Sequence, residues 1–286
     1  MPGLSYSPAA MSQEHEGVYL PTSRANTFES TQLASAGWYA EGQHGGPLAA
    51  LIVSRIEKVP TLTEMEIARV TIEIFRVIPL SPLTIDTEVI REGKRVQTVQ
   101  ARITGPDGTL LSIAVAQRLR VADRQLPAEA ATEATPLPSP GESERNDAKA
   151  WGVGESGKTM FHRDAIEIRE IHGGFSSIGP GAIWVRPTVP VIAGEDITPA
   201  QRAVMAADFC NGVSSRLEID DWIYMNSDLS IHIGRYPTGE WVALDALSYY
   251  SDSGRGVAAG ILWDQDLWVG RSAQTLFLDR NQRLSN

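Results

Sequence analysis

Residues 70–120 read VTIEIFRVIPLSPLTIDTEVIREGKRVQTVQARITGPDGTLLSIAVAQRLR, and residues 228–280 read DLSIHIGRYPTGEWVALDALSYYSDSGRGVAAGILWDQDLWVGRSAQTLFLDR. Each stretch contains four strand-like runs separated by Gly, Asp and Pro, the residues that hairpin turns need. In both, the first run ends in Arg and then Pro, and the last carries an Ala-Gln pair: Arg76 and Pro79, Arg235 and Pro237, Ala116-Gln117, and Ala273-Gln274. The two stretches are therefore an internal repeat, and each predicts an antiparallel meander.

One mostly apolar helix is predicted ahead of each meander. In the first half, LAALIVSRIEKV at residues 48–59 follows Pro47, which suits the first position of a helix. In the second half, Thr198 can cap a helix that begins at Pro199 and continues through AQRAVMAADFCNGVSSRL at residues 200–217. Helices that are apolar on most faces must be buried. A buried helix wrapped by a curved antiparallel sheet is the hotdog arrangement, so the sequence predicts an α+β fold, a tandem (double) hotdog.

The segment between the repeats divides the chain. Residues 123–159 are rich in Pro, Ala, Glu, Ser and Gly and lack apolar periodicity, as expected of a surface linker. We therefore expect an N-terminal hotdog domain over residues 1–122, with a flexible start of about 15 residues, and a C-terminal hotdog domain over residues 160–286. Hotdog sheets pair edge to edge, which predicts a pseudo-dimer within the chain and further assembly into a homo-oligomer.

Composition argues against several classes of function. The single cysteine, Cys210, allows no intramolecular disulfide and no thiolate metal cluster, which favours a reducing compartment. The first residues lack the basic and apolar regions of a signal peptide, and nowhere do about 18 apolar residues run together. We therefore expect a cytoplasmic protein without membrane insertion. The net charge of −10 argues against nucleic acid as a partner.

Asp208 is the main candidate for chemistry. It lies within an apolar run and has no Lys or Arg at helical spacing to pair with it, so burial is expected to make it a better base. The alternative is a helix residue that reaches solvent at the mouth of the domain. Asn226 is predicted to share a strand face with Asp228, Ser230 and His232, and Gln274 one with Ser272, Leu276 and Leu278. Either amide can bind a water or be purely structural, and Gln117, the repeat partner of Gln274, is expected to be structural.

His44, Gly45 and Gly46 form a second candidate group. The two glycines open a helix and leave its first N–H groups uncovered, which suits an oxyanion or a thioester carbonyl. His44 can be a base or ligand, although a lone His beside two glycines is more often a capping or packing residue. No second His or carboxylate stands at metal spacing, so we expect no metal.

Two further patterns concern other enzyme classes. Residues 152–159, GVGESGKT, match the phosphate-binding loop of nucleotide hydrolases, and Trp241 to Asp245 resembles the strand that accompanies it. The residues before this loop are polar, however, and the meanders lack the strand–helix alternation that such folds need. No G-x-S-x-G occurs, which argues against a serine esterase. Hydrolysis would therefore use activated water.

These residues resemble the double-hotdog acyl-CoA thioesterases of the thioesterase II type. The resemblance covers roughly residues 30–120 and 160–280 and includes the Gly-Gly start of the first helix, Phe75-Arg76 with Pro79, and Glu88 before Arg91-Glu-Gly93. It implies catalytic Asp208, Asn226 and Gln274, although family members commonly have Thr where Asn226 stands. The second Arg-Pro pair is also loosened, to Gly234-Arg235-Tyr236-Pro237. The implied reaction is hydrolysis of acyl-CoA by a water that Asp208 orients and that Asn226 and Gln274 fix in place, with the Gly45 and Gly46 amides binding the oxyanion.

The resemblance implies acyl-CoA as substrate and no separate cofactor, because coenzyme A is part of the substrate. Two alternatives keep the same fold: a noncatalytic module that binds acyl-CoA or acyl chains, and an enoyl-CoA hydratase. The hydratase ranks lower because it would want a His close to Asp208, and none follows within several residues. We expect exposed Lys or Arg near the mouth of the acyl groove, rather than Arg76 or Arg235, to bind the CoA phosphates.

Overall fold

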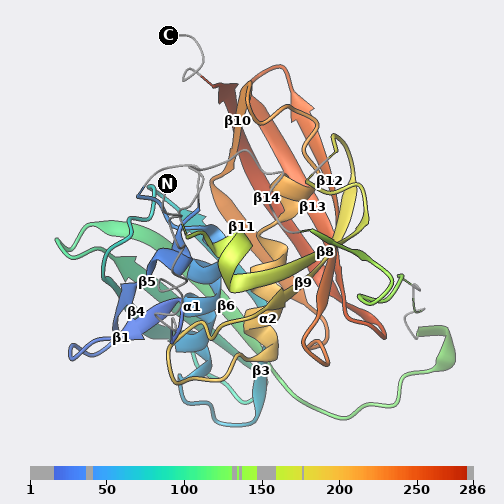
Figure 1. Ribbon diagram of the computed structural model, residues 1–286. Coiled ribbons are helices and arrows are strands. Elements are labelled where there is room, and N and C mark those ends of the chain that lie inside the picture. The colour runs from blue at the N-terminus through green and yellow to red at the C-terminus, as the bar shows by residue number, and fades with distance from the viewer. Residues whose placement is uncertain are drawn as a thin grey trace, which may run out of the picture.

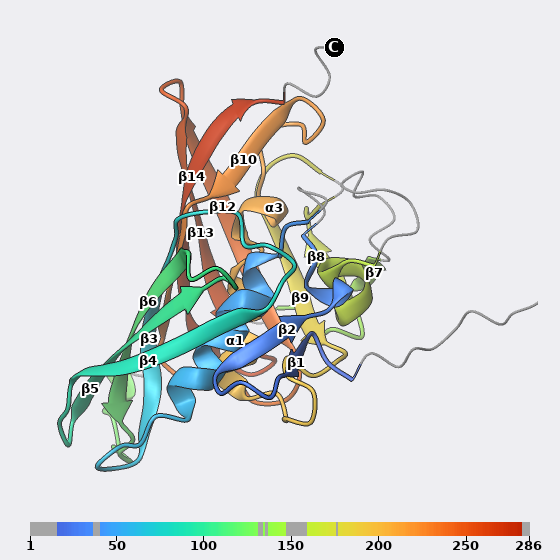
Figure 2. The ribbon, with the colours of Figure 1, turned by 90° about the vertical axis from the view of Figure 1, so that its left-hand side faces the viewer.

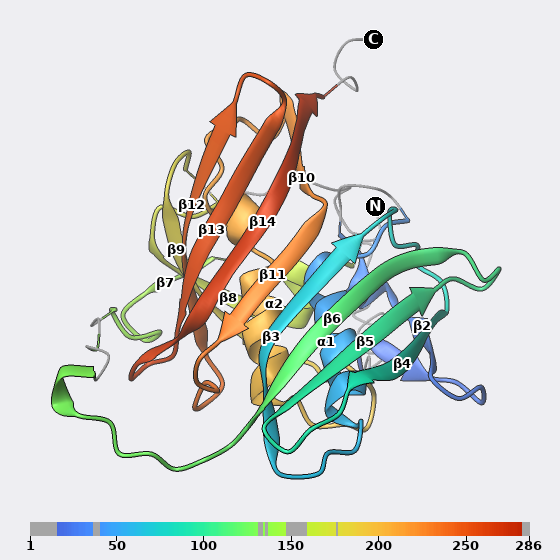
Figure 3. The ribbon, with the colours of Figure 1, turned by 180° about the vertical axis from the view of Figure 1, so that it is seen from behind.

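The computed structural model describes residues 16–36, 41–130, 134, 137–146, 159–175 and 177–281. Within these ranges, fourteen strands form one antiparallel sheet in the order β1-β2-β4-β5-β6-β3-β11-β14-β13-β12-β9-β8-β7, with β10 also paired to β14 (Figure 3). The strands are β1 Tyr19–Pro21, β2 Thr27–Ser30, β3 Met65–Ile74, β4 Leu83–Arg91, β5 Val96–Thr104, β6 Leu110–Arg120, β7 Glu144–Asn146, β8 Ile166–His172, β9 Gly181–Pro187, β10 Trp222–Asn226, β11 Asp228–Ile233, β12 Val242–Ser251, β13 Arg255–Trp263 and β14 Trp268–Arg280.

The helices lie together on one side of this sheet (Figures 1 and 2). They are α1 Gly45–Glu57, α2 Pro199–Ala207 and α3 Cys210–Val213, with 3-10 turns at Gln32–Ala34 and Ala128–Ala130 and a π-helical turn at Phe161–Ala165. Every residue of α1 from Gly46 to Ser54 is buried, as its apolar sequence predicts. One apolar cluster continues through both halves of the chain, and the tandem hotdog fold is confirmed.

Each half contains the four predicted strands, but their order differs from a simple meander. The first strand lies beside the last: β3 pairs with β6, and β11 pairs with β14. The connection after each first strand carries the Arg and Pro of the repeat, and Pro lacks the N–H that would extend a ladder. Because each first strand lies at the end of its own set of four, β3 and β11 meet at the centre of the sheet, with Asp228 opposite Glu73 and His232 opposite Arg69. This is the predicted edge-to-edge junction of the two halves.

The second helix begins where the sequence predicts and ends earlier. Thr198 caps α2 and forms a capping box with Gln201. The predicted helix through residue 217 is wrong, because α2 ends at Ala207 and a separate turn, α3, begins at Cys210. At this break the Asp208 carbonyl accepts a hydrogen bond from the Gln274 side chain (3.1 Å), and the N–H of Gly212, which would bond to it in a continuous helix, donates to Asn211 Oδ1 (2.8 Å). Asp208 therefore caps α2 rather than lying in mid-helix.

The segment predicted as a linker is partly attached to the second half. Its strand β7 extends the sheet beside β8, and Trp184 Nε1 donates to the carbonyl oxygen of Pro138 (2.9 Å). The predicted division at residues 122 and 160 stays a prediction. Residues 152–158 of the loop-like GVGESGKT lie outside the described residues, and Asp245 lies in β12, between antiparallel neighbours. Among the described helices, none is long and apolar enough to span a membrane.

Candidate active site

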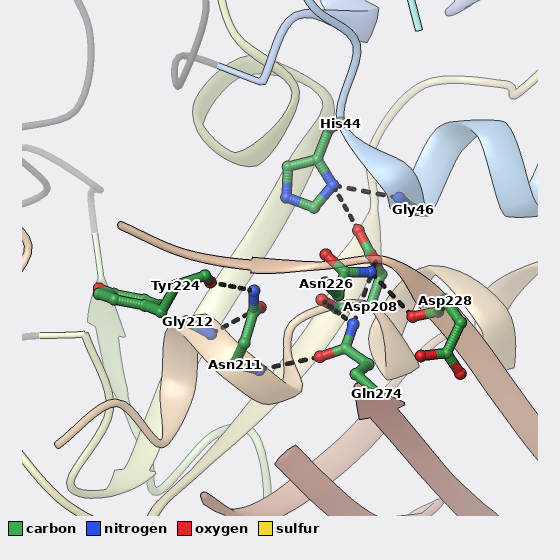
Figure 4. Close-up of polar contacts among 9 residues, drawn as sticks. All are labelled: His44, Gly46, Asp208, Asn211, Gly212, Tyr224, Asn226, Asp228 and Gln274. Atoms are coloured by element: carbon green, nitrogen blue, oxygen red, sulfur yellow. Dashed lines mark hydrogen bonds and ion pairs between the residues drawn. The ribbon is translucent and has the colours of Figure 1, made fainter. Parts of the chain in front are cut away.

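The start of α1 in the first half lies against the end of α2 in the second (Figure 4). His44 caps α1, and its Nδ1 lies 2.8 Å from Oδ2 of Asp208, the cap of α2. Gly45 lies directly against this carboxylate: a Cβ added to Gly45 would lie 2.6 Å from Asp208 Oδ1 and 2.8 Å from Oδ2. Such distances are shorter than real carbon contacts, so the approach of the two helix ends requires glycine at this position.

Asp208 is a buried carboxylate, with 5% of its surface exposed. Two side-chain amides donate to its Oδ1, Gln274 Nε2 at 3.3 Å and Asn226 Nδ2 at 3.5 Å. No Lys or Arg of the described ranges forms an ion pair with it. Amide donors can stabilise an ionised carboxylate without neutralising it, as a general base requires. The alternative that Asp208 reaches solvent is wrong.

Gln274 is oriented by three contacts with the turn between α2 and α3. Its Oε1 accepts from the backbone N–H of Asn211 (3.1 Å), which directs its amino group to the carbonyl and carboxylate of Asp208. It is buried on the same face as Ser272, Leu276 and Leu278, as predicted. The assignment of Gln117 as its repeat partner is wrong. Gln117 alternates with the buried Ala116 and Arg118 and so faces outward, because a shift of one residue exchanges the faces of a strand.

Asn226 reaches the site because the strand is interrupted after it. Asn226 lies opposite Leu276 of β14, whereas Ser230 lies opposite Ala273. The step from Asn226 to Ser230 is four residues, and the matching step along β14 is three, so the β10–β11 segment contains one extra residue. The extra residue, between Ser227 and Ser230, forms a bulge that exchanges the faces of the chain, so Asn226 points to the inner face. Asp228 Oδ1 accepts from the N–H of Thr275 (2.6 Å) at this irregularity. The predicted shared face of Asn226 with Asp228 and Ser230 is therefore wrong.

Asn211 is a site residue that the sequence reasoning missed. Its side chain donates to the carbonyl of Tyr224 in β10 (3.1 Å) and accepts from the N–H of Gly212 (2.8 Å). It therefore ties the turn that orients Gln274 to the strand that carries Asn226. A polar residue three positions after Asp208 in an otherwise apolar run was the available signal.

Whether His44 Nδ1 carries a proton decides if it bonds to the Gly46 N–H or to the Asp208 carboxylate. His44 Nδ1 lies 3.1 Å from the N–H of Gly46 as well as 2.8 Å from Asp208. A nitrogen that accepts from Gly46 cannot also donate to Asp208, so the two contacts exclude each other when Asp208 is ionised. The Gly45 N–H has no acceptor within the described residues. The expectation that His44 is a capping and packing residue agrees with its cap on Gly46 and its ring contacts with Phe161 and Phe209 (centroids 5.1 and 4.9 Å).

A second histidine lies beside this group. The ring centroid of His162 is 6.3 Å from that of His44, and only 4% of its surface is exposed. Burial, with smaller contributions from the neighbouring His44 and Arg163, lowers the pKa of His162 to about 3. His162 is therefore neutral at ordinary pH.

A cavity of about 340 Å³ opens beside Asp208. Its polar wall includes His44, Gly45, Asp208 and Asn226, and its apolar wall includes the buried Ala36, Leu48 and Ile78. Five exposed residues line its mouth: Phe75, Arg76, Val77, Ser227 and Phe277. A small apolar cavity with a few converging polar groups is the usual form of a substrate site. Within the described ranges no cluster of His, Cys, Asp and Glu could hold a metal ion, and the expectation of no metal or cofactor stays a prediction.

Comparison with known proteins agrees with this architecture. A family model described as the acyl-CoA thioesterase N-terminal domain matches residues 34–126, and one described as the C-terminal domain matches residues 127–278. A search of curated protein sequences finds no match.

Solved structures show the same fold over most of the chain. A protein of Novosphingobium aromaticivorans is 19% identical (TM-score 0.67) and covers 92% of this chain and 98% of its own. A hot dog fold protein of Alicyclobacillus acidocaldarius is 16% identical (TM-score 0.67; 89% and 94%). The acyl-CoA thioesterase II of Mycobacterium marinum is 14% identical (TM-score 0.60; 93% and 96%). Because both domain models match in order along the two hotdog halves, the chain belongs to the acyl-CoA thioesterase family and is a double-hotdog thioesterase.

Proposed function

We propose that this protein hydrolyses fatty acyl-CoA to the free acid and CoA, with Asp208 as the base that activates water. The observation that carries the proposal is the buried Asp208 carboxylate, which receives two amide donors and lines the cavity. Such a carboxylate can remain ionised and accept a proton from water. The apolar wall of the cavity suits an acyl chain.

The two amides have different parts in this proposal. Gln274 has its oxygen occupied by the Asn211 N–H, so its amino group can only orient Asp208. The Asn226 side chain donates to Asp208 and to the Asp228 carbonyl (3.2 Å), which leaves its oxygen free to accept from the attacking water. A water between Asn226 and Asp208 would then be held for attack on the thioester carbonyl. This division goes beyond the sequence-based expectation, in which both amides fix the water.

The reaction needs a place for the developing oxyanion. The Gly45 N–H at the start of α1 is available, and the positive end of the helix favours negative charge there. When His44 Nδ1 carries a proton it donates to Asp208, and the Gly46 N–H is released to join Gly45. Water oxygen bonds to the carbonyl carbon, the C–S bond breaks, and the proton taken by Asp208 passes to the departing CoA sulfur.

Cys210 is not an alternative nucleophile. It lies two residues from Asp208, is fully buried, and contacts Ser272 Oγ (2.9 Å). Burial raises the pKa of the Cys210 thiol to about 12, so the reactive thiolate is not formed at neutral pH. Attack by water is thus the route that the described side chains support.

The test is release of CoA thiol from a panel of short to long acyl-CoAs, followed with a thiol-reactive dye. We expect release by the wild type and a loss of at least about 100-fold in Asp208→Asn, because the amide keeps the shape but cannot accept the proton. Melting curves with acyl-CoA check that the variant folds and binds. If the wild type binds acyl-CoA without releasing thiol, the noncatalytic binding alternative replaces the proposal. Full activity in Asp208→Asn would overturn the role of Asp208.

One observation keeps the hydratase alternative under test. The sequence argument against it was the absence of a His near Asp208, yet the fold brings His44 Nδ1 to 2.8 Å from this carboxylate. A hydratase would add water across the double bond of an enoyl-CoA without releasing thiol. Loss of enoyl absorbance with no thiol release would favour the hydratase, and thiol release from saturated acyl-CoA would exclude it as the main activity.

A further inference from the structure

Arg76 lies at the mouth of the cavity that contains Asp208. Strand β3 ends at Ile74, and the next three residues, Phe75, Arg76 and Val77, line the cavity and are exposed. The chain is fixed at this point, since the N–H of Ile74 donates to the Ser227 carbonyl (2.9 Å) and that of Phe75 to the Leu111 carbonyl (3.0 Å). Arg76 is the only Lys or Arg among the described residues that line this cavity.

Arg76 has no direct partner for its charge among the described residues. No hydrogen bond or ion pair joins its guanidinium to another described residue. The Asp107 carboxylate makes its contacts with Thr109, at 2.9 and 2.8 Å. These hydrogen bonds hold the pKa of Asp107 below its usual value, and the charge of Arg76 contributes only slightly. The Arg76 side chain is therefore free to bind an external anion.

Its repeat partner shows that this freedom is specific to one half. Arg235 follows β11 as Arg76 follows β3, but its Nη2 pairs with Asp264 Oδ2 at 2.6 Å. It also donates to the carbonyls of Trp268 and Leu267 (both 3.3 Å). The Arg of the repeat thus has a structural role in the second half, as Arg235. In the first half, Arg76 lies at the cavity mouth without an ion-pair partner among the described residues.

We propose that Arg76 binds a phosphate group of the CoA part of the substrate and so gives the enzyme its preference for CoA thioesters. This reverses the expectation from the sequence for Arg76, because its side chain is itself the exposed cation at the cavity mouth. The proposal rests on the proposed thioesterase function. A chain of net charge −10 repels a polyanionic substrate, which makes a local cation at the entrance necessary for its capture. Arginine forms forked hydrogen bonds with phosphate. The exposed Phe75 and Phe277 at the same mouth offer apolar surface to the pantetheine arm.

The test compares two substrates with one acyl group, acyl-CoA and the phosphate-free acyl-N-acetylcysteamine. The quantity is the ratio of their kcat/KM values, which cancels changes in folding or in the chemical step. We expect Arg76→Gln to lower this ratio about three- to tenfold, as for one exposed charge-assisted contact. Added salt should lower the wild-type ratio and leave that of Arg76→Gln nearly unchanged. Arg91→Gln, at the exposed end of β4, removes the same charge away from the cavity and should keep the wild-type ratio.

The outcomes separate this proposal from the proposed function. An unchanged ratio in Arg76→Gln, with both esters hydrolysed, overturns the role of Arg76 and leaves thioester hydrolysis intact. If neither ester is hydrolysed, the proposed function fails, and titration of free CoA still tests Arg76, since Arg76→Gln must then bind CoA more weakly than Arg91→Gln. Acyl-phosphopantetheine locates the contact. An equal loss with this substrate supports the arm's own phosphate, and a loss confined to acyl-CoA supports the nucleotide phosphates.

Discussion

Replacing Gly45 by alanine tests the close contact between the start of α1 and the Asp208 carboxylate. A Cβ at Gly45 would lie 2.6 Å from Asp208 Oδ1, whereas ordinary contact begins at 3.4 Å, so the carboxylate or the start of α1 must move by about 0.8 Å. Misplacement by about 1 Å can cost a catalytic site about 100-fold in rate. We therefore expect kcat/KM for acyl-CoA to fall about 10- to 100-fold, which corresponds to about 1.4–2.7 kcal/mol of transition-state stabilisation.

Gly46→Ala is the matched control, one residue further along the same helix. Its added Cβ would lie 3.3 Å from the Met205 carbonyl and from Phe161, and 3.4 Å from His44, contacts that small shifts can relieve. Neither glycine has a positive φ, so alanine strains the backbone at neither position. Thiol release and melting temperature are measured for both variants. The reasoning is refuted if Gly45→Ala folds and keeps the wild-type rate, or if Gly46→Ala loses as much activity.

Two further predictions concern residues beside the site. Asn211→Ala removes the bond to the Tyr224 carbonyl, and we expect a several-fold loss of kcat with little change in KM, since one hydrogen bond of about 1 kcal/mol positions Gln274; a rise in KM alone would contradict this positioning role. For His162, whose folded pKa of about 3 lies below the ordinary 6.5, stability is fully present above pH 6.5 and is lost as the pH falls toward 3. Between pH 7 and about 4.5 this loss is about 2.5 kcal/mol. The free energy of unfolding, measured in urea at several pH values, should therefore fall less steeply with pH in His162→Gln, and an unchanged pH dependence would exclude His162 as its source.

The sequence predicted much of the fold because its signals are local and periodic. The repeat located all eight central strands, and the apolar runs located both buried helices and the Thr198 cap. The order of strands was not local information: β3 lies beside β6 because of a pairing across the sheet. The break of α2 at Asp208 likewise depends on Gln274, which lies 66 residues away in the chain.

The candidate residues could be named from the sequence, but their geometry could not. Buried polar residues in apolar runs are visible in any sequence, which is how Asp208 and Gln274 were chosen. A single bulge between Asn226 and Ser230 places Asn226 on the inner face, and a one-residue offset places Gln117 on the outer face, because strand faces alternate residue by residue.

The sequence by itself determined the tandem hotdog architecture, since periodic burial and turn residues repeat in both halves. Only the tertiary structure decided that His44, Gly45 and Asp208 from different halves form one site, and that Arg235 has an ion-pair partner whereas Arg76 has none within the described part of the chain. The physical reason is that contacts between distant segments depend on register and helix ends. Register and helix ends are set by the packing of the whole core, so neither segment shows them as a periodic pattern in its own sequence.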